Sequence, residues 1–507
     1  MRIYIYLYLS PVLIEMKITI FGSYRQEPLS KYYTVSSIQE DLTYPHYTKE
    51  IIQAIEYCKG THEMKSSDTS YCFRTGILQK REINNRNNLI REFEETDLFV
   101  IEIASRISYE YNNIYVHHIL TEEQYGFEHR DQIIQRDLSD IEIEQDIIRI
   151  KELIYPKKLL IVSHIYTRPC GKRYDLIKHI DRVCLSHNIP FLSPSDHINH
   201  QDLYLNEPIL AHFSEKGKHV MSNIYKSTID YMCTKKIVVF VLKQQYYNCK
   251  QTSTEHFWGI GDMMRSIYGM YKKSKKYNFK LIIDISNHPI SKYLENINHD
   301  YISPMNNIIH NIPYLVGDNV DTHIREHMNS ANEVTYIGCH CGLDAYHPSE
   351  YDQETKIFIK RMIRPNREFL SFFNEKIGNL NISDMDVLHY RLGDNELISH
   401  NINTNKIEYC YQHILQQLNT NTILLSDSSA LKSYVKEKNC NIHTFDHDIG
   451  HIGYDTSEHK IMNSLFEYFL LTKVKSIKTH SIYNWISGFT YSVHKIYDIP
   501  ITSSVCF

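Results

Sequence analysis

The sequence predicts two α/β domains, each a largely parallel sheet covered by helices, that join near residue 234. Two observations favour this fold class. Short apolar runs alternate with amphipathic helical stretches from residue 16 to residue 233, and a second series of the same kind opens at residue 235. The chain has 507 residues, which is more than one hydrophobic core usually organises, and the length also favours several structural units.

Composition places the chain among globular proteins and limits its partners. It is 42% hydrophobic and 23% charged, with a formal charge of -5, so no global positive field favours nucleic acid. The eleven cysteines form no CxxC pair, and Cys339 and Cys341 flank His340 in a spacing that matches no standard zinc arrangement. We therefore expect reduced thiols and no metal site.

The first fifteen residues form a separate segment. Arg2 precedes an apolar run over residues 3–14, which has the length of a signal-peptide core but lacks a small-residue cleavage site and is too short to span a bilayer. Residues 1–15 are predicted to be an apolar leader or an upstream extension before the strand that Met16 opens. No other stretch reaches about 20 apolar residues, so we expect no membrane span and a cytoplasmic protein, with a secretory route left open by residues 3–14.

The N-terminal domain is predicted over residues 16–234. Its strand candidates are Lys17–Phe21, Leu98–Ile103, Leu159–Ser163 and Ile189–Leu192, and its helix candidates are Tyr47–Cys58, Ile141–Ile154 and Tyr174–His187. Strands and helices that alternate in this way are typical of a parallel sheet with helices on its faces.

The C-terminal domain is predicted over residues 235–507, opening with the buried-strand run of residues 235–244. Further candidates are helices at Asp262–Tyr277, Glu354–Arg361 and Ala430–Glu437, and strands at Lys280–Ile285, Val387–Tyr390 and Thr422–Leu425. Two Rossmann-like halves joined near residue 385 would close on a cleft.

Polar side chains stand at and beyond the end of the predicted strand at residues 387–390. His389, Arg391 and Asp394 lie at its carboxyl end, which is where open α/β sheets bind ligands. The guanidinium of Arg391 can hold two phosphate oxygens and offset the charge of a departing diphosphate. An ordinary strand end with a surface ion pair between Arg391 and Asp394 is the alternative.

Three other segments of this domain carry related chemistry. Gly259 and Gly261 start a helix that also bears Asp262 and Arg265, and helix-start amides can face a phosphate. Asp427 follows Ser426 at a strand end, where it can accept from a base edge or simply cap the next helix. A late segment around Ser481 supplies hydroxyls for phosphate or for an ordinary helix start.

The order and spacing of these four segments resemble GT-B fucosyltransferases of the α-1,2, α-1,6 and nodulation-related group. Their H-x-R-x-G-D strand end stands here as His389 to Asp394, after a G-x-G-D-x-x-R loop at Gly259 to Arg265 and before the pair Ser426–Asp427 and the serine-rich segment at 481–487. The resemblance covers residues 235–507.

The resemblance implies an inverting glycosyltransferase with no essential metal that uses a GDP-sugar, GDP-fucose first, as donor and a glycan or glycoprotein as acceptor. It implies that Arg391 binds the β-phosphate, His389 and Asp427 hold guanine, and Ser481 touches phosphate. Gly259, Gly261, Asp262 and Arg265 would line the cleft from the first half. The resemblance does not fix the acceptor base, for which Asp394 and Glu396 are candidates.

The N-terminal domain carries a separate hypothesis. Ser23 follows the first strand after Gly22, and His212 lies far downstream, where it can return to activate a weak hydroxyl nucleophile. This order resembles SGNH-type hydrolases and acyltransferases, which implies a three-layer α/β domain, although Ile209 stands where those families usually carry Asp.

Around this serine the alternatives stay open. Asp202 or Asp196 is a substitute orienting carboxylate, and Glu102 and Arg106 are candidates to line the same cleft. A helix cap is the simpler interpretation of Ser23. The histidines at positions 197, 200, 212 and 219 match no metal-binding spacing.

Taken together, the sequence predicts a glycan-assembly protein whose C-terminal domain is a fucosyltransferase-like enzyme. One alternative is an esterase or acetyltransferase that acts on glycans through Ser23 and His212. Another is a glycan-binding structural protein without catalysis, such as a component of a viral particle.

Overall fold

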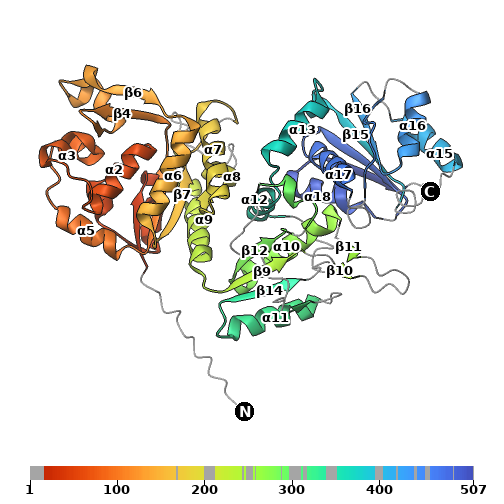
Figure 1. Cartoon of the computed structure of the whole chain (residues 1–507), viewed down its shortest axis with the longest axis horizontal. Coiled ribbons are helices and arrows are strands. Elements are labelled where there is room, and N and C mark those ends of the chain that lie inside the picture. Colours follow the sequence, from red (N-terminus) through yellow and green to blue (C-terminus); the bar gives the residue numbers. More distant parts are fainter. Residues whose placement is uncertain are drawn as a thin grey trace, which may run out of the picture. The chain divides into compact units, whose positions relative to one another are not determined.

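The computed structural model divides the chain into two units, residues 1–232 and 233–507. It describes residues 16–166, 169–198, 212–242, 245–246, 255–256, 259–286, 288–295, 310–311, 317–338, 351–393, 404–417, 421–438, 442–450, 457–483 and 485–505. Both units are mixed α/β structures with parallel sheets (Figure 1). The sequence predicted this boundary two residues later, after residue 234.

Unit 1 is built on a five-stranded parallel sheet of order β2-β1-β3-β7-β8. The strands are β1 (Lys17–Phe21), β2 (Thr34–Val35), β3 (Leu98–Ile103), β7 (Lys158–Ser163) and β8 (Phe191–Leu192). A small antiparallel sheet of order β5-β4-β6 is made by β4 (Ile107–Tyr111), β5 (Ile114–Tyr115) and β6 (Ile134–Asp137). The sequence predicted four of the five main strands.

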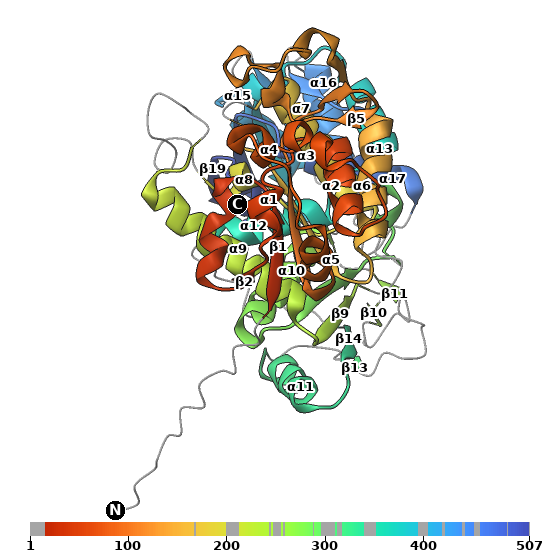
Figure 2. The ribbon, with the colours of Figure 1, turned by 90° about the vertical axis from the view of Figure 1, so that its left-hand side faces the viewer.

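The helices of unit 1 cover both faces of that sheet. They are α1 (Ile38–Asp41), α2 (Thr48–Cys58), α3 (Ser66–Cys72), α4 (Arg74–Gln79), α5 (Arg86–Glu95), α6 (Asp140–Ile154), α7 (Lys172–Ser186), α8 (Pro194–His197) and α9 (Glu215–Cys233), with 3-10 turns at Tyr24–Lys31, His118–Thr121, Glu123–Tyr125 and Arg130–Gln132. In Figure 2, α9 lies to the left of β1, and α2, α5 and α6 lie to its right. The helices predicted at 47–58, 141–154 and 174–187 are confirmed within two residues.

Unit 2 has two parallel sheets. The first has the order β12-β9-β14-β13, and the second has the order β17-β16-β15-β18-β19. Their strands are β9 (Ile237–Val241), β12 (Lys280–Asp284), β13 (His310–Asn311), β14 (Val334–Gly338), β15 (Asp386–Arg391), β16 (Thr422–Ser426), β17 (His443–Thr444), β18 (Ser476–Ser481) and β19 (Ile501–Val505); an antiparallel pair is formed by β10 (Gln245–Tyr246) and β11 (Glu255–His256). The expectation of two half-units around residue 385 matches this division between the sheets.

The helices of unit 2 alternate with its strands. They are α10 (Ile260–Tyr277), α11 (Gly317–Asn329), α12 (Gln353–Met362), α13 (Arg367–Ile377), α15 (Thr404–Leu415), α16 (Ser429–Lys438), α17 (Glu458–Leu471) and α18 (Gly488–Tyr497), with 3-10 turns at Ser291–Tyr293 and Ile382–Asp384. None of the described helices is long and apolar enough to cross a bilayer.

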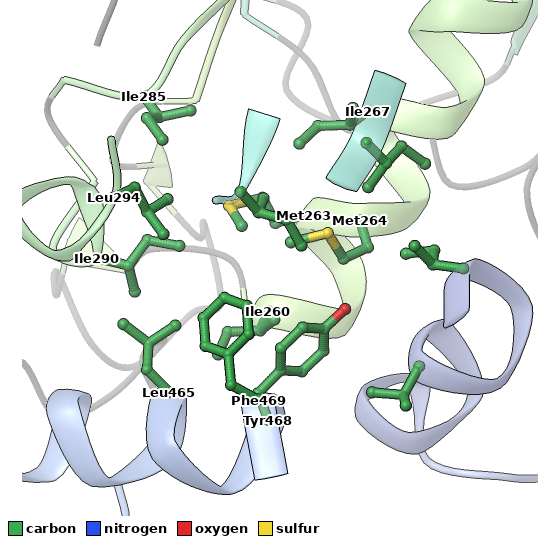
Figure 3. Packing of buried hydrophobic residues seen from close by; sticks show 14 of the residues in the cluster. Ile260, Met263, Met264, Ile267, Ile285, Ile290, Leu294, Leu465, Tyr468 and Phe469 are labelled. Carbon is green, nitrogen blue, oxygen red and sulfur yellow. The ribbon is translucent and has the colours of Figure 1, made fainter. Parts of the chain in front are cut away.

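One hydrophobic cluster joins the two halves of unit 2. It takes residues from β9, β12 and α10 of the first half and from β15, β16, α17 and α18 of the second. Figure 3 shows the α10 residues Ile260, Met263 and Met264 packed opposite Leu465, Tyr468 and Phe469 of α17. The start of α10 is therefore held firmly against the second half.

Candidate active site

A cavity of about 360 Å³ lies in unit 2 at the carboxyl end of β15. From β15 the chain steps outward to β16 and β17 on one side, and then returns to add β18 and β19 on the other. The strand order therefore reverses between β15 and β18, and open α/β sheets bind ligands outside the carboxyl ends of the strands at such a switch point. The position of the cavity is the one that this topology favours.

Side chains alternate between the two faces of β15, and two of the predicted site residues lie on the face that lines this cavity. Leu388, Tyr390 and Leu392 face the cluster beneath α15 and α16. Neighbouring side chains of a strand point to opposite faces, so His389 and Arg391 share the other face, where both line the cavity. Their Cα atoms are about 6.6 Å apart along the strand.

Asp427 organises the end of β15. Its carboxylate accepts hydrogen bonds from Arg391 Nη1 at 2.5 Å, from the backbone N–H of Leu392 at 2.7 Å and from that of Gly393 at 3.0 Å. Gly393 has φ +107°, a conformation that favours glycine, and this lets the chain turn beneath the carboxylate. Asp427 was predicted to hold guanine; it lines the cavity, and through these bonds it also positions Arg391.

His389 lies at the inner end of the cavity. It is buried, and its Nδ1 is hydrogen-bonded to Thr490 Oγ1 at 2.8 Å. Burial lowers the pKa of His389 below its ordinary value, so the ring is neutral at pH 7. A neutral imidazole that is held at Nδ1 can present Nε2 to a bound ligand.

Glu467 is a site residue that the sequence did not indicate. It lies on α17, is 1% exposed and lines the cavity beside His389. Burial would raise its pKa, but a hydrogen bond from His447 Nε2 at 3.0 Å and the nearby Lys432 outweigh that effect and hold the pKa below its ordinary value. The inner end of the cavity therefore carries an ionised carboxylate.

Two helix N-termini meet at the cavity. The start of α10 (Gly259, Ile260 and Gly261) and the start of α18 (Ser487 and Gly488) both line it. A Cβ on Gly261 would lie 2.3 Å from the carbonyl carbon of Gly488, so the two helices are in backbone-to-backbone contact at this point. Among the described residues no side chain caps either N-terminus, which leaves first-turn N–H groups to serve an anion.

Arg265 adds positive charge beside these helix starts. It lines the cavity and forms an ion pair with Asp262 on the same helix. One guanidinium nitrogen lies 3.6 Å from the position that a Cβ on Gly488 would take, next to the start of α18. Arg265 and Arg391 therefore contribute two cationic groups to the wall of one cavity.

The remaining predicted residues of unit 2 are placed differently. Ser481 is the last residue of β18, and its Oγ accepts from the backbone N–H of Tyr483 at 3.0 Å. Within the described part of the chain Ser481 is not among the lining residues, whereas Ser487 is. Asp394 and Glu396 lie outside the described residues.

In unit 1, Ser23 caps the 3-10 turn that follows β1. Its Oγ accepts from Arg25 Nη1 at 2.8 Å, and Glu102 accepts from Ser23 N at 2.9 Å and from Arg25 Nη1 at 3.1 Å. The ring of His212 stacks on Tyr24 with centroids 5.0 Å apart. Among the described residues no hydrogen bond joins Ser23 to His212.

The other candidates of unit 1 are spread out. Arg106 pairs with Asp140 at the start of α6, and Asp196 accepts from Tyr166 Oη at 3.2 Å. Neither residue has a bond to Ser23 within the described ranges. Asp202 and Ile209 lie outside those ranges.

Comparisons with known proteins give weak likenesses. Residues 16–132 match the family described as "TviD N-terminal domain". Comparison with curated protein sequences found no match.

Several solved fucosyltransferase structures resemble part of the chain. NodZ from Bradyrhizobium is 14% identical, with a TM-score of 0.30, over 52% of this chain and 94% of its own. The Arabidopsis thaliana FUT1 mutant in complex with GDP is 11% identical, with a TM-score of 0.33, over 56% of this chain and 74% of its own. POFUT1 in complex with GDP is 10% identical, with a TM-score of 0.24, over 69% and 98%. Likenesses at this level establish no shared activity.

Proposed function

We propose that unit 2 is a glycosyltransferase that transfers fucose from GDP-fucose to a glycan hydroxyl with inversion. The observation that carries the proposal is the meeting of two helix N-termini with Arg265 and Arg391 in one cavity. Oriented N–H groups, two helix dipoles and two guanidinium groups suit a diphosphate.

The inner end of the cavity supports guanine as the base. Guanine presents two adjacent donors, N1–H and the N2 amino group, and a carboxylate can accept both at once. Glu467 is ionised and buried there, with the neutral ring of His389 beside it. Glu467 therefore takes the base-binding role that the sequence had suggested for Asp427.

In the transfer step, the oxygen of an acceptor hydroxyl attacks C1 of the sugar and forms the new C–O bond. The bond from C1 to the β-phosphate oxygen breaks, and GDP leaves with the electron pair. Arg391 and the helix N-termini stabilise the charge that develops on that oxygen. The hydroxyl proton passes to a carboxylate, for which the sequence offers Asp394 and Glu396.

Nucleotide binding tests this proposal directly. GDP should raise the melting temperature of the purified chain, whereas UDP, CMP and ADP should not, because a ligand of the native state stabilises it by mass action. Arg391→Met should remove most of the GDP shift and slow fucose transfer to a glycan mixture by about 100-fold or more. A rise in melting temperature with another nucleotide instead of GDP would mean that the donor carries that nucleotide. Glycan binding without a rise for any nucleotide would favour the non-catalytic alternative.

For unit 1 we propose an SGNH-like three-layer fold. The support is the all-parallel sheet order β2-β1-β3-β7-β8 with Ser23 at the carboxyl end of the first strand. Esterase or acyltransferase chemistry would require a general base that accepts the proton of Ser23 Oγ, and this oxygen now accepts a hydrogen bond from Arg25. The candidate base is His212, whose ring stacks on the neighbouring Tyr24.

A further inference from the structure

A stacked pair of aromatic rings, one half-buried and one exposed, lines the unit 2 cavity. Tyr483 and Trp485 stack with centroids 4.9 Å apart and an angle of 14° between their planes, and both line the cavity. Trp485 is 66% exposed. Among the described residues, no other large hydrophobic side chain with such exposure lines this cavity.

The pair lies at the outer end of the site. At the end of β15, His389 and Arg391 line the cavity, and the chain then turns at Gly393. A Cβ on Gly393 would lie 3.3 Å from Tyr483 Oη, so the aromatic pair adjoins that turn. Glu467 and His389 at the inner end and the helix starts in the middle leave the outer end for the sugar and the acceptor.

The chemistry of the pair suits a pyranose ring. Stacking on Tyr483 holds the indole in place, so a flat apolar face is offered to solvent with little further loss of side-chain freedom. A neutral pyranose presents an apolar face of C–H groups and keeps its hydroxyls at the edge. The indole of Trp485 matches this pattern, because its face is apolar and its edge carries a single N–H donor.

We propose that Tyr483 and Trp485 form a stacking platform that binds the acceptor glycan through the apolar face of one neutral pyranose ring. The proposal rests on the proposed function, because it assigns the inner cavity to the nucleotide. It adds the chemical class of the acceptor unit and the residues that hold it.

The test measures binding of methyl β-D-glucopyranoside and methyl β-D-galactopyranoside to the full chain by saturation-transfer NMR. Wild type and Trp485→Phe should bind at least one of the two, with transfer strongest to the C–H protons of one ring face. In Trp485→Ala the affinity should fall at least tenfold, while the GDP-induced rise in melting temperature stays as in wild type.

Three outcomes would overturn the platform. In the first, wild type binds neither pyranoside, and in the second, Trp485→Ala binds them as well as wild type does. In the third, Trp485→Ala loses GDP binding and keeps sugar binding, which would place the guanine base on Trp485. Failure of the proposed function is a separate result, since it shows as no GDP shift in wild type whatever the pyranosides do. Because Trp485 is largely exposed, its replacement is not expected to unfold the chain.

Discussion

Gly261→Ala tests whether contact between the two helix N-termini builds the phosphate site. The added Cβ would lie 2.3 Å from Gly488 C, 2.6 Å from Phe489 N and 2.7 Å from Gly488 O. Carbon atoms in contact normally lie about 3.5–4.0 Å apart, so α10 and α18 must separate by at least about 1 Å. Backbone atoms on both sides prevent an easier adjustment.

The size of the effect follows from this separation. Overpacking costs about 1–3 kcal/mol, and the better helix propensity of alanine returns up to about 1 kcal/mol, so the free energy of unfolding should fall by about 0–3 kcal/mol. Losing the alignment of one helix end should weaken GDP binding by about 1 kcal/mol, or about fivefold in Kd. A displacement of about 1 Å at the leaving group should slow transfer by about 100-fold.

Calorimetric titration with GDP and initial rates with GDP-fucose measure both effects. Lys272→Ala is the matched control, since it places alanine in the same helix at a half-exposed side chain that bonds Asp352 and does not line the cavity. If Gly261→Ala is folded and equals wild type in Kd and rate, contact between the two helix N-termini does not build the phosphate site.

Three further predictions concern single groups. Glu467→Gln should abolish the preference for GDP over ADP, because the amide keeps one acceptor oxygen and sets an NH2 donor against the second guanine donor. A competition titration should show the ratio of the two Kd values change at least tenfold. Burial lowers the pKa of His46, His117 and His164, so below about pH 6.5 only the unfolded chain gains their protons. As the pH falls, unit 1 should therefore lose up to about 1.4 kcal/mol of stability per histidine for each pH unit. A urea unfolding midpoint that stays flat from about pH 7.5 to 5.5 contradicts this prediction. If unit 1 is an esterase, Ser23→Ala should lower hydrolysis of a fluorogenic acetyl ester by at least 100-fold, and an unchanged rate removes the serine hypothesis.

Strands and helices with strong periodicity could be predicted from the sequence. The bounds of β1 and β3 match the predicted residues, and α10 begins two residues before its predicted start. The late strand β18 was missed, because its sequence SIKTHS mixes polar residues with a single large apolar one and looks like a loop. Thr479, His480 and Ser481 are nevertheless buried, and only the tertiary packing makes that favourable.

The candidate site shows the same division. His389 and Arg391 could be predicted because the residues at a strand's carboxyl end are local in sequence. Glu467 could not be assigned, since it lies 78 positions after His389 and only the packing of α17 against β15 brings them together. A usable signal existed, because Glu467 is the only acidic residue in the apolar stretch from Ile461 to Leu471, and an acid in a buried helix needs a partner.

The shared cluster of α10 and α17 has a consequence for how unit 2 folds and unfolds. Because one continuous core serves both sheets, neither half can expose its own side of that core without destroying the other's. Denaturation should therefore remove both sheets in a single cooperative transition, and a fragment ending near residue 385 should fail to fold alone. The two halves should then behave as one thermodynamic body, so the cavity-lining groups on either side keep their spacing for as long as the protein is folded.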